Sequence, residues 1–145
     1  MDRRSFIRIG VAGAATGIIA PQIVLAGPLK KKMSAGNMAG GVFYTKEAPG
    51  RWKKKAGAHS PIITKTDAGV QVVTGHPMKA NDHWIIKHVL LDSDFNFIAQ
   101  NMFNPSKDKA AISDFSFSDR PGYSGAVYAL SVCNKHDSWL SVLEV

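Results

Sequence analysis

The chain has 145 residues, of which 45% are hydrophobic and 20% charged, a composition typical of one globular domain with appended segments. Its formal net charge is +7, but no nucleic-acid recognition motif accompanies the basic residues, so we expect no nucleic-acid partner. The single cysteine, Cys133, excludes an internal disulfide and any metal module built from four cysteines.

Residues 1–26 have the features of a twin-arginine export signal. The pair Arg3-Arg4 precedes a moderately apolar stretch that ends in the small-residue pattern Val24-Leu25-Ala26. The apolar stretch is about seventeen residues long and is interrupted by glycines and by Pro21, whereas a membrane span needs about twenty apolar residues. We therefore expect cleavage after Ala26, export to the periplasm and no stable membrane span in the mature protein.

The remainder divides into an N-terminal segment and one domain. Residues 27–50 are rich in Gly, Lys, Met and Ala without a sustained period, and we interpret them as a linker or N-terminal arm. Residues 51–145 contain about seven short strand-like runs separated by turn signals, and no convincing amphipathic helix. The expected strands span 61–66, 70–74, 83–92, 95–103, 111–117, 125–133 and 139–145. This pattern predicts an all-β antiparallel sandwich.

Four of the five histidines and the only cysteine fall at the ends of predicted strands. His59 precedes the first strand, and His76 and His83 bracket the turn before the third. Cys133 and His136 form a Cys-x-x-His pair after an apolar strand. Imidazole and thiolate together suit iron, copper or zinc, and suit magnesium or calcium poorly. These five residues therefore predict a transition-metal site.

The fifth histidine, His88, is separated from the others by the alternation of a strand. Alternate residues of a strand face the same side of a sheet, which places His88 on the side opposite to His83, together with Trp84, Ile86 and Leu90. We expect a packed or surface histidine at this position and not a metal ligand.

Three motifs of the domain are distinctive in combination: Trp52-Lys53…His59-Ser60-Pro61-Ile62, Gly75-His76-Pro77-Met78…His83-Trp84-Ile85, and the continuous run from Ala129 to Trp139. Together they resemble the superoxide reductase family, which includes neelaredoxin and the iron-binding domain of desulfoferrodoxin. The resemblance covers residues 51–145 and implies an immunoglobulin-like seven-stranded sandwich. It also implies one iron ion per chain, with Cys133 as the axial thiolate and with equatorial nitrogens from His59, His76, His83 and His136.

The resemblance implies a function as well. A family member reduces superoxide by one electron to hydrogen peroxide at ferrous iron, with Cys133 as the catalytic thiolate ligand and an axial position open to solvent. An external donor, rubredoxin-like or another small redox protein, re-reduces the iron, and a homodimer or homotetramer is expected. Three alternatives stay open: an iron protein that only transfers electrons, a structural zinc site, and a metal-free binding module.

The sequence departs from the family pattern in two places. Many members have Glu-Lys immediately before the first histidine, where this chain has Gly57-Ala58. The glutamate closes the ferric site in those members and the lysine attracts superoxide. The turn from His76 to His83 is also one residue longer than in many relatives, which a loop tolerates easily.

Other residues are candidates for these two lost roles. Water, hydroxide or a more distant carboxylate such as Glu47 could fill the open position of ferric iron. Because a charge steers an anion without touching the metal, three lysines could attract superoxide: Lys53, Lys54 and Lys55. The alternative is that these lysines are ordinary solvated surface.

Overall fold

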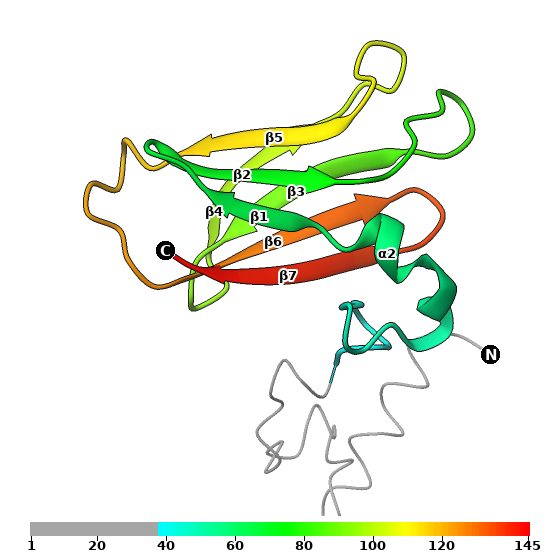
Figure 1. The fold of residues 1–145 in the computed structure, drawn as a ribbon, viewed down its shortest axis with the longest axis horizontal. Coiled ribbons are helices and arrows are strands. Elements are labelled where there is room, and N and C mark those ends of the chain that lie inside the picture. Colours follow the sequence, from blue (N-terminus) through cyan, green and yellow to red (C-terminus); the bar gives the residue numbers. More distant parts are fainter. Residues whose placement is uncertain (1–37) are drawn as a thin grey trace, which may run out of the picture. The chain divides into compact units, whose positions relative to one another are not determined.

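The structure, a computed structural model, describes residues 38–145, and these form two antiparallel sheets (Figure 1). One sheet has the order β1-β2-β5, with β1 at Ile62–Lys65, β2 at Gly69–Thr74 and β5 at Ala111–Ser116. The other has the order β4-β3-β6-β7, with β4 at Phe97–Met102, β3 at Ile85–Leu91, β6 at Ala126–Cys133 and β7 at Ser138–Glu144.

The predicted fold class, an immunoglobulin-like seven-stranded sandwich, is confirmed. Each observed strand lies within its predicted range or extends beyond it by a single residue. The predicted export signal and its cleavage site after Ala26 lie outside the described residues, as do residues 27–37 of the predicted arm. No helix of the described part is long and apolar enough to cross a membrane.

Alternation along the strands builds the core between the two sheets. In β6 every second side chain, from Val127 through Ala129 and Ser131 to Cys133, points inward and is buried. The main cluster packs Leu90 of β3 and Val127 against side chains of β2 and β5. A second apolar cluster, made by Ile85, Phe103, Ala111 and Cys133, lies beneath the end of the sandwich where β6 finishes.

A β-bulge in β3 changes which residues face the core. The pairing between β3 and β6 shifts register between Ile85 and Lys87, so Ile85 and His88 both lie inside although they are separated by an odd number of positions. The expectation that His88 shares a face with Leu90 is therefore confirmed, but Ile86 is only half-buried and does not share that face. His88 is a fully buried histidine between the sheets.

Part of the predicted arm lies against the edge of the four-stranded sheet. Tyr44 forms a parallel bridge with Trp139 of β7, donating its amide to the carbonyl of Ser138 at 2.9 Å and accepting from the amide of Leu140 at 2.8 Å. Both aromatic rings are buried, with centroids 5.7 Å apart. The arm thus pairs with backbone groups that an edge strand would otherwise leave exposed.

Two short helical segments connect the arm to β1. A 3₁₀ helix, η3 (Gly50–Lys55), leads into a single α-helical turn, α2 (Ala56–His59). The helix ends at Ser60, whose backbone is extended (ψ 121°), because the following Pro61 disfavours the helical conformation of the residue before it. In Figure 1 this helix lies at the same end of the sandwich as the β6–β7 turn, and the C-terminus lies at the other end.

We expect Leu90→Ala to lower the free energy of unfolding by about 2–5 kcal/mol, because it empties a fully buried site at the centre of the main cluster. Urea denaturation of the metal-free protein measures this change. Val142→Ala is the control, since Val142 is 56% exposed and should change stability by less than about 0.5 kcal/mol. Equal losses in both variants would contradict the assignment of the core.

Candidate metal centre

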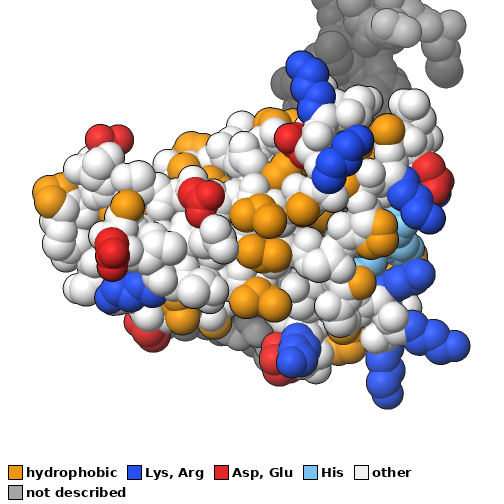
Figure 2. Space-filling model, turned by 45° about the horizontal axis from the view of Figure 1, so that its top comes forward, with side chains coloured by type: hydrophobic (Ala, Val, Ile, Leu, Met, Phe, Trp, Pro, Cys, Tyr) orange, Lys and Arg blue, Asp and Glu red, His pale blue; other side chains and the backbone are white. Residues whose placement is uncertain are grey.

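Four histidines and the single cysteine converge at one end of the sandwich. His59 ends α2, His76 and His83 lie in the connection between β2 and β3, and His136 follows Cys133 in the β6–β7 turn. One potential ligand atom from each of the five side chains lies within 4.8 Å of all the others. Figure 2 shows histidine side chains at this end with lysine and arginine side chains around them.

The His76–His83 connection is a tight turn held by its own backbone. Lys79 and His83 exchange two backbone hydrogen bonds, each 3.0 Å long. Asn81, at the tip, has a positive φ of 63°, a conformation that Asn tolerates better than most residues. With this turn, both His76 and His83 reach the cluster.

The Cys133–Asp137 turn is the second support of the cluster. The amide of Cys133 donates to the carbonyl of Asp137 at 2.9 Å, and Asp137 takes a positive φ of 60° to close the turn. The Lys135 amide points at the cysteine sulfur, with N···Sγ at 3.4 Å. The indole nitrogen of Trp139 donates to the carbonyl of His136 at 2.8 Å and fixes the start of β7.

Asn134 ties these two turns together. Its side-chain oxygen accepts from the amide of Trp84 at 3.0 Å, and its side-chain nitrogen donates to the carbonyl of Asp82 at 2.8 Å. Lys135 and Asp82 add an exposed ion pair across the same gap. The relative placement of His83 and Cys133 thus depends on a side chain that is not itself part of the cluster.

A second group of side chains covers His136. The Trp52 ring meets the imidazole of His136 edge-on, with centroids 4.7 Å apart. The indole nitrogen of Trp52 donates to a carboxylate oxygen of Asp137 at 2.8 Å, and Arg51 pairs with the same carboxylate. These contacts join η3 to the β6–β7 turn.

Hydrogen bonds to backbone carbonyls set the proton positions of two histidines. The Nδ1 atom of His59 lies 2.9 Å from the carbonyl of Lys55, and that of His76 lies 2.6 Å from the carbonyl of Pro77. A carbonyl can only accept, so each Nδ1 carries the proton and each Nε2 presents a lone pair to the cluster. Both side chains are therefore arranged as neutral metal ligands.

The close contacts among the ring nitrogens and the sulfur outnumber the protons that could make them hydrogen bonds. Nε2 of His83 lies 3.0 Å from Nε2 of His76, 2.9 Å from Nδ1 of His136 and 3.2 Å from Sγ of Cys133. One nitrogen carries at most one proton, so it cannot donate along all three contacts. A cation among these atoms satisfies all the lone pairs at once, and in this respect the donor set fits a bound metal ion.

The four imidazoles follow one another around a ring. Neighbouring centroids, in the order His59, His76, His83, His136 and back to His59, are 4.3–4.8 Å apart, whereas His59 and His83 across the ring are 5.8 Å apart. Two nitrogens bound to one metal ion at about 2.1 Å lie about 3.0 Å apart at a right angle and about 3.4 Å apart at the tetrahedral angle. The observed neighbouring N···N distances of 2.9–3.0 Å fit the right angle.

The cluster histidines are held neutral mainly by burial. Burial lowers the pKa of His59 from 6.5 to about 4 and also lowers the pKa values of His76, His83 and His136. The positive charge of Lys55 contributes to the lowered pKa of each of these last three histidines. The nitrogens are therefore free to bind a metal ion at neutral pH.

The predicted lysines lie on η3, all three exposed: Lys53, Lys54 and Lys55. Lys55 is distinguished by its electrostatic effect on the cluster histidines and by its carbonyl, which holds His59. At the family's Glu-Lys positions, Gly57 is exposed and no atom lies within 4 Å of a Cβ built on it. Within residues 38–145 no carboxylate belongs to the cluster, so Glu47 lies outside it.

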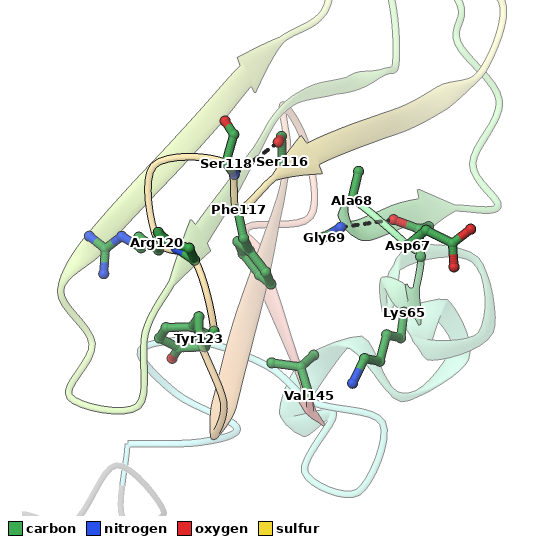
Figure 3. A pocket seen from close by; sticks show the side chains of 13 residues that line it. Lys65, Asp67, Ala68, Gly69, Ser116, Phe117, Ser118, Arg120, Tyr123 and Val145 are labelled. Atoms are coloured by element: carbon green, nitrogen blue, oxygen red, sulfur yellow. Dashed lines mark hydrogen bonds between the residues drawn. The ribbon is translucent and has the colours of Figure 1, made fainter.

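A cavity of about 420 Å³ lies at the other end of the sandwich (Figure 3). It is bounded by the β1–β2 turn, the β5–β6 loop and Val145, and the ring of Phe117 lies against that of Tyr123 with centroids 5.3 Å apart. Its lining contains no histidine or cysteine. The cavity therefore offers none of the nitrogen or sulfur donors that the cluster provides.

Comparison with known proteins shows the family to which the chain belongs. The family model described as desulfoferrodoxin matches residues 50–142, nearly all of the sandwich. The chain belongs to the desulfoferrodoxin family. No curated protein sequence matches the chain significantly.

Solved structures similar to this family member carry the name superoxide reductase. One variant form of the superoxide reductase (neelaredoxin) from Ignicoccus hospitalis is 26% identical, with a TM-score of 0.58 over 77% of this chain and 96% of that one. A second variant form of the same protein is also 26% identical, with a TM-score of 0.52 over the same shares. The Giardia intestinalis superoxide reductase (1Fe-SOR), 21% identical, shares the fold, with a TM-score of 0.51 over 61% of this chain and 98% of that one.

We expect the metal-free protein to lose stability as the pH falls from about 6.5 to about 4. Burial lowers the pKa of His59 and of His88 from 6.5 to about 4, so in this range the unfolded chain binds more protons than the folded one. Each of the two contributes about 3 kcal/mol that is lost across this window, since one pKa unit is worth about 1.4 kcal/mol. Urea denaturation at a series of pH values measures the loss, and constant stability from pH 7 to 4 would contradict it.

Proposed function

We propose that this protein is a superoxide reductase, which reduces superoxide to hydrogen peroxide at one mononuclear iron ion per chain. The observation that carries the proposal is the convergence of four neutral imidazoles and one thiol in a member of the desulfoferrodoxin family. The 26% identity to the two Ignicoccus neelaredoxin variants supports the same activity.

Iron is the metal that this donor set favours in our proposal. The ligands would be His59, His76, His83, Cys133 and His136. Structural zinc prefers four ligands at tetrahedral angles, whereas five donors are gathered here and neighbouring nitrogens are 2.9–3.0 Å apart. Bound ferrous iron supplies one electron to superoxide, and two protons from solvent complete hydrogen peroxide.

The sulfur lies on the core side of the four imidazoles, and this determines which face of the site an anion can reach. Cys133 is buried and packs with Ile85, Phe103 and Ala111, whereas His83 and His136 are partly exposed. The face of the four imidazoles that lies away from Cys133 is therefore the face that we expect a small anion to reach. The Lys135 amide, 3.4 Å from the sulfur, is a further contact that orients the Cys133 side chain.

Lys55 is our candidate for the electrostatic role that Ala58 cannot play. Its charge already acts on three of the cluster histidines, and an anion approaching the same nitrogens would be attracted by it. Lys53 and Lys54, next to it on η3, would add to the field at longer range. Water or hydroxide, not a protein carboxylate, is the expected occupant of the open position in the oxidised protein.

The charge distribution also supports a partner for re-reduction. Three exposed lysines of η3 lie beside His59 of the cluster, at Lys53, Lys54 and Lys55, whereas Arg51 and Lys135 are paired with Asp137 and Asp82. We propose an acidic small redox protein, rubredoxin-like or otherwise, as the external electron donor. Homo-oligomerisation and periplasmic export by the twin-arginine route complete the proposal, and fractionation of cells that express the full chain tests the export.

The reduced, iron-loaded protein should consume one superoxide per iron and release one hydrogen peroxide without dioxygen, when mixed with superoxide under anaerobic conditions. Release of dioxygen would identify dismutation instead, and no reaction would favour a protein that only transfers electrons. A protein that binds zinc or no metal would contradict the proposal. Cys133→Ser should lose the visible thiolate-to-iron absorption of the oxidised protein, because Cys133 would supply the only sulfur ligand among the five cluster residues.

Lys55→Ala should slow the bimolecular reaction with superoxide by roughly two- to fivefold at low ionic strength, and the difference should shrink in high salt. Lys65→Ala is the matched control, because it removes the same charge from β1 at the other end of the sandwich. The rates come from pulse radiolysis. Equal rates for the two variants at low salt would show that Lys55 does not steer the substrate.

A further inference from the structure

A chain of buried polar side chains crosses the space between the two sheets, outside the metal cluster. His88 of β3 is at its centre, with Nε2 2.9 Å from Oγ1 of Thr74 and Nδ1 2.9 Å from Oγ of Ser113. Thr74 continues to Oγ of Ser131 at 2.8 Å, and Asn101 donates to Ser113 at 3.0 Å. This network of side chains therefore links five different strands, and the imidazole ring at its centre is fully buried.

The donor and the acceptor of each hydrogen bond in this network can be assigned. The amide nitrogen of Asn101 can only donate, and the hydroxyl of Thr74 donates to Ser131. Thr74 therefore accepts from Nε2–H of His88, and the Ser113 hydroxyl donates to the unprotonated Nδ1. A neutral imidazole supplies this one donor and one acceptor, so every hydrogen-bonding group of the ring is used.

Two members of this network, Thr74 and Ser131, lie next to members of the metal cluster. Thr74 is the last residue of β2, and its carbonyl accepts from the amide of His76 at 2.7 Å. Ser131 precedes Cys133 by two positions on β6, so their side chains share the inward face. The Thr74–Ser131 hydrogen bond thus connects the points in the two sheets from which His76 and Cys133 depart, and His88 is the second partner of the Thr74 hydroxyl.

Polar contact gives this connection a property that apolar packing lacks. Apolar packing between two sheets stabilises the fold but is non-directional, so it does not fix the relative position of the sheets. A hydrogen bond has a narrow range of length and angle. Burying three polar side chains here is favourable only because each of them is paired. The network therefore restricts how far the two sheets can shift relative to each other at this point.

We propose that His88 is a positioning residue for the metal centre: by donating to Thr74 it directs the Thr74 hydroxyl at Ser131, and the Thr74–Ser131 bond fixes the separation of His76 from Cys133. The proposal rests on the metal site proposed above. Phe103 supports the ring from the side, edge-on with centroids 5.0 Å apart, and Phe103 also packs in the apolar cluster that contains Cys133. His88 itself does not touch the metal ligands and takes no part in the reaction.

The test compares variants of the full chain that break the link with one that only weakens the core. Thr74→Val removes the central hydroxyl at constant shape, and His88→Leu removes the imidazole. Both should speed the loss of ferrous iron to an excess chelator at least about threefold and shift the thiolate-to-iron absorption of the oxidised protein. His88→Gln, which keeps a donor and an acceptor, should restore part of both properties.

Leu90→Ala is the matched control, because Leu90 lies two positions from His88 on the same inward face and makes no hydrogen bond through its side chain. It should lower stability while leaving the absorption and the rate of iron loss near those of the unsubstituted protein. Thr74→Val combined with His88→Leu should lose iron no faster than the faster single variant, since both break one link.

Unchanged iron loss and absorption in Thr74→Val and His88→Leu, or an equal change in Leu90→Ala, would overturn the proposal while leaving the proposed function intact. If the unsubstituted protein binds no iron, the proposed function fails, and amide exchange in the metal-free protein decides the positioning role. Exchange at His76 relative to Val127 should then rise in Thr74→Val, and an unchanged ratio would overturn the proposal.

Discussion

The structure depends on one electrostatic constraint: five electron-pair donors are brought together closely enough to hold one shared cation. Carbonyl partners fix the lone pairs of His59 and His76 toward the cluster, and His83 has three close contacts for at most one proton. Burial lowers the pKa of these histidines, so protons are a poor substitute for a metal ion at neutral pH. Metal binding and the stability of this end of the sandwich are therefore linked.

The donors come together because the connections that carry them all lie at one end of the sandwich. Its strands need no unusual conformation to deliver the donors, because β2, β3, β6 and β7 all begin or finish there. Asn134 joins the two turns from outside, and the His88 network joins the two sheets from inside. The donors themselves are thus placed by groups that do not contact a metal ion.

The strand pattern and the five donors were predictable from the sequence because both follow local rules. Turn residues and alternation locate the strands, and the sequence alone shows that histidines lie at the ends of these strands. The bulge near Ile86 was not predictable, because an extra residue in one strand depends on pairing with β6. For this reason alternation placed His88 correctly beside Leu90 but misplaced Ile86.

The supporting residues also required the structure. Asn134 lies between Cys133 and His136, yet its partners are backbone groups of Trp84 and Asp82, about fifty positions away in the chain. The sequence does not distinguish Lys55 from Lys53 and Lys54. In the structure, η3 places the Lys55 carbonyl within hydrogen-bond distance of His59 and the Lys55 charge near the other histidines.

X-ray absorption at the iron edge, on the protein loaded with ferrous iron, measures the ligands of the metal. We expect one iron per chain with four nitrogen ligands and one sulfur ligand, and loss of the sulfur contribution in Cys133→Ser. Iron without a sulfur ligand, or a preference for zinc in a four-coordinate site, would contradict this expectation.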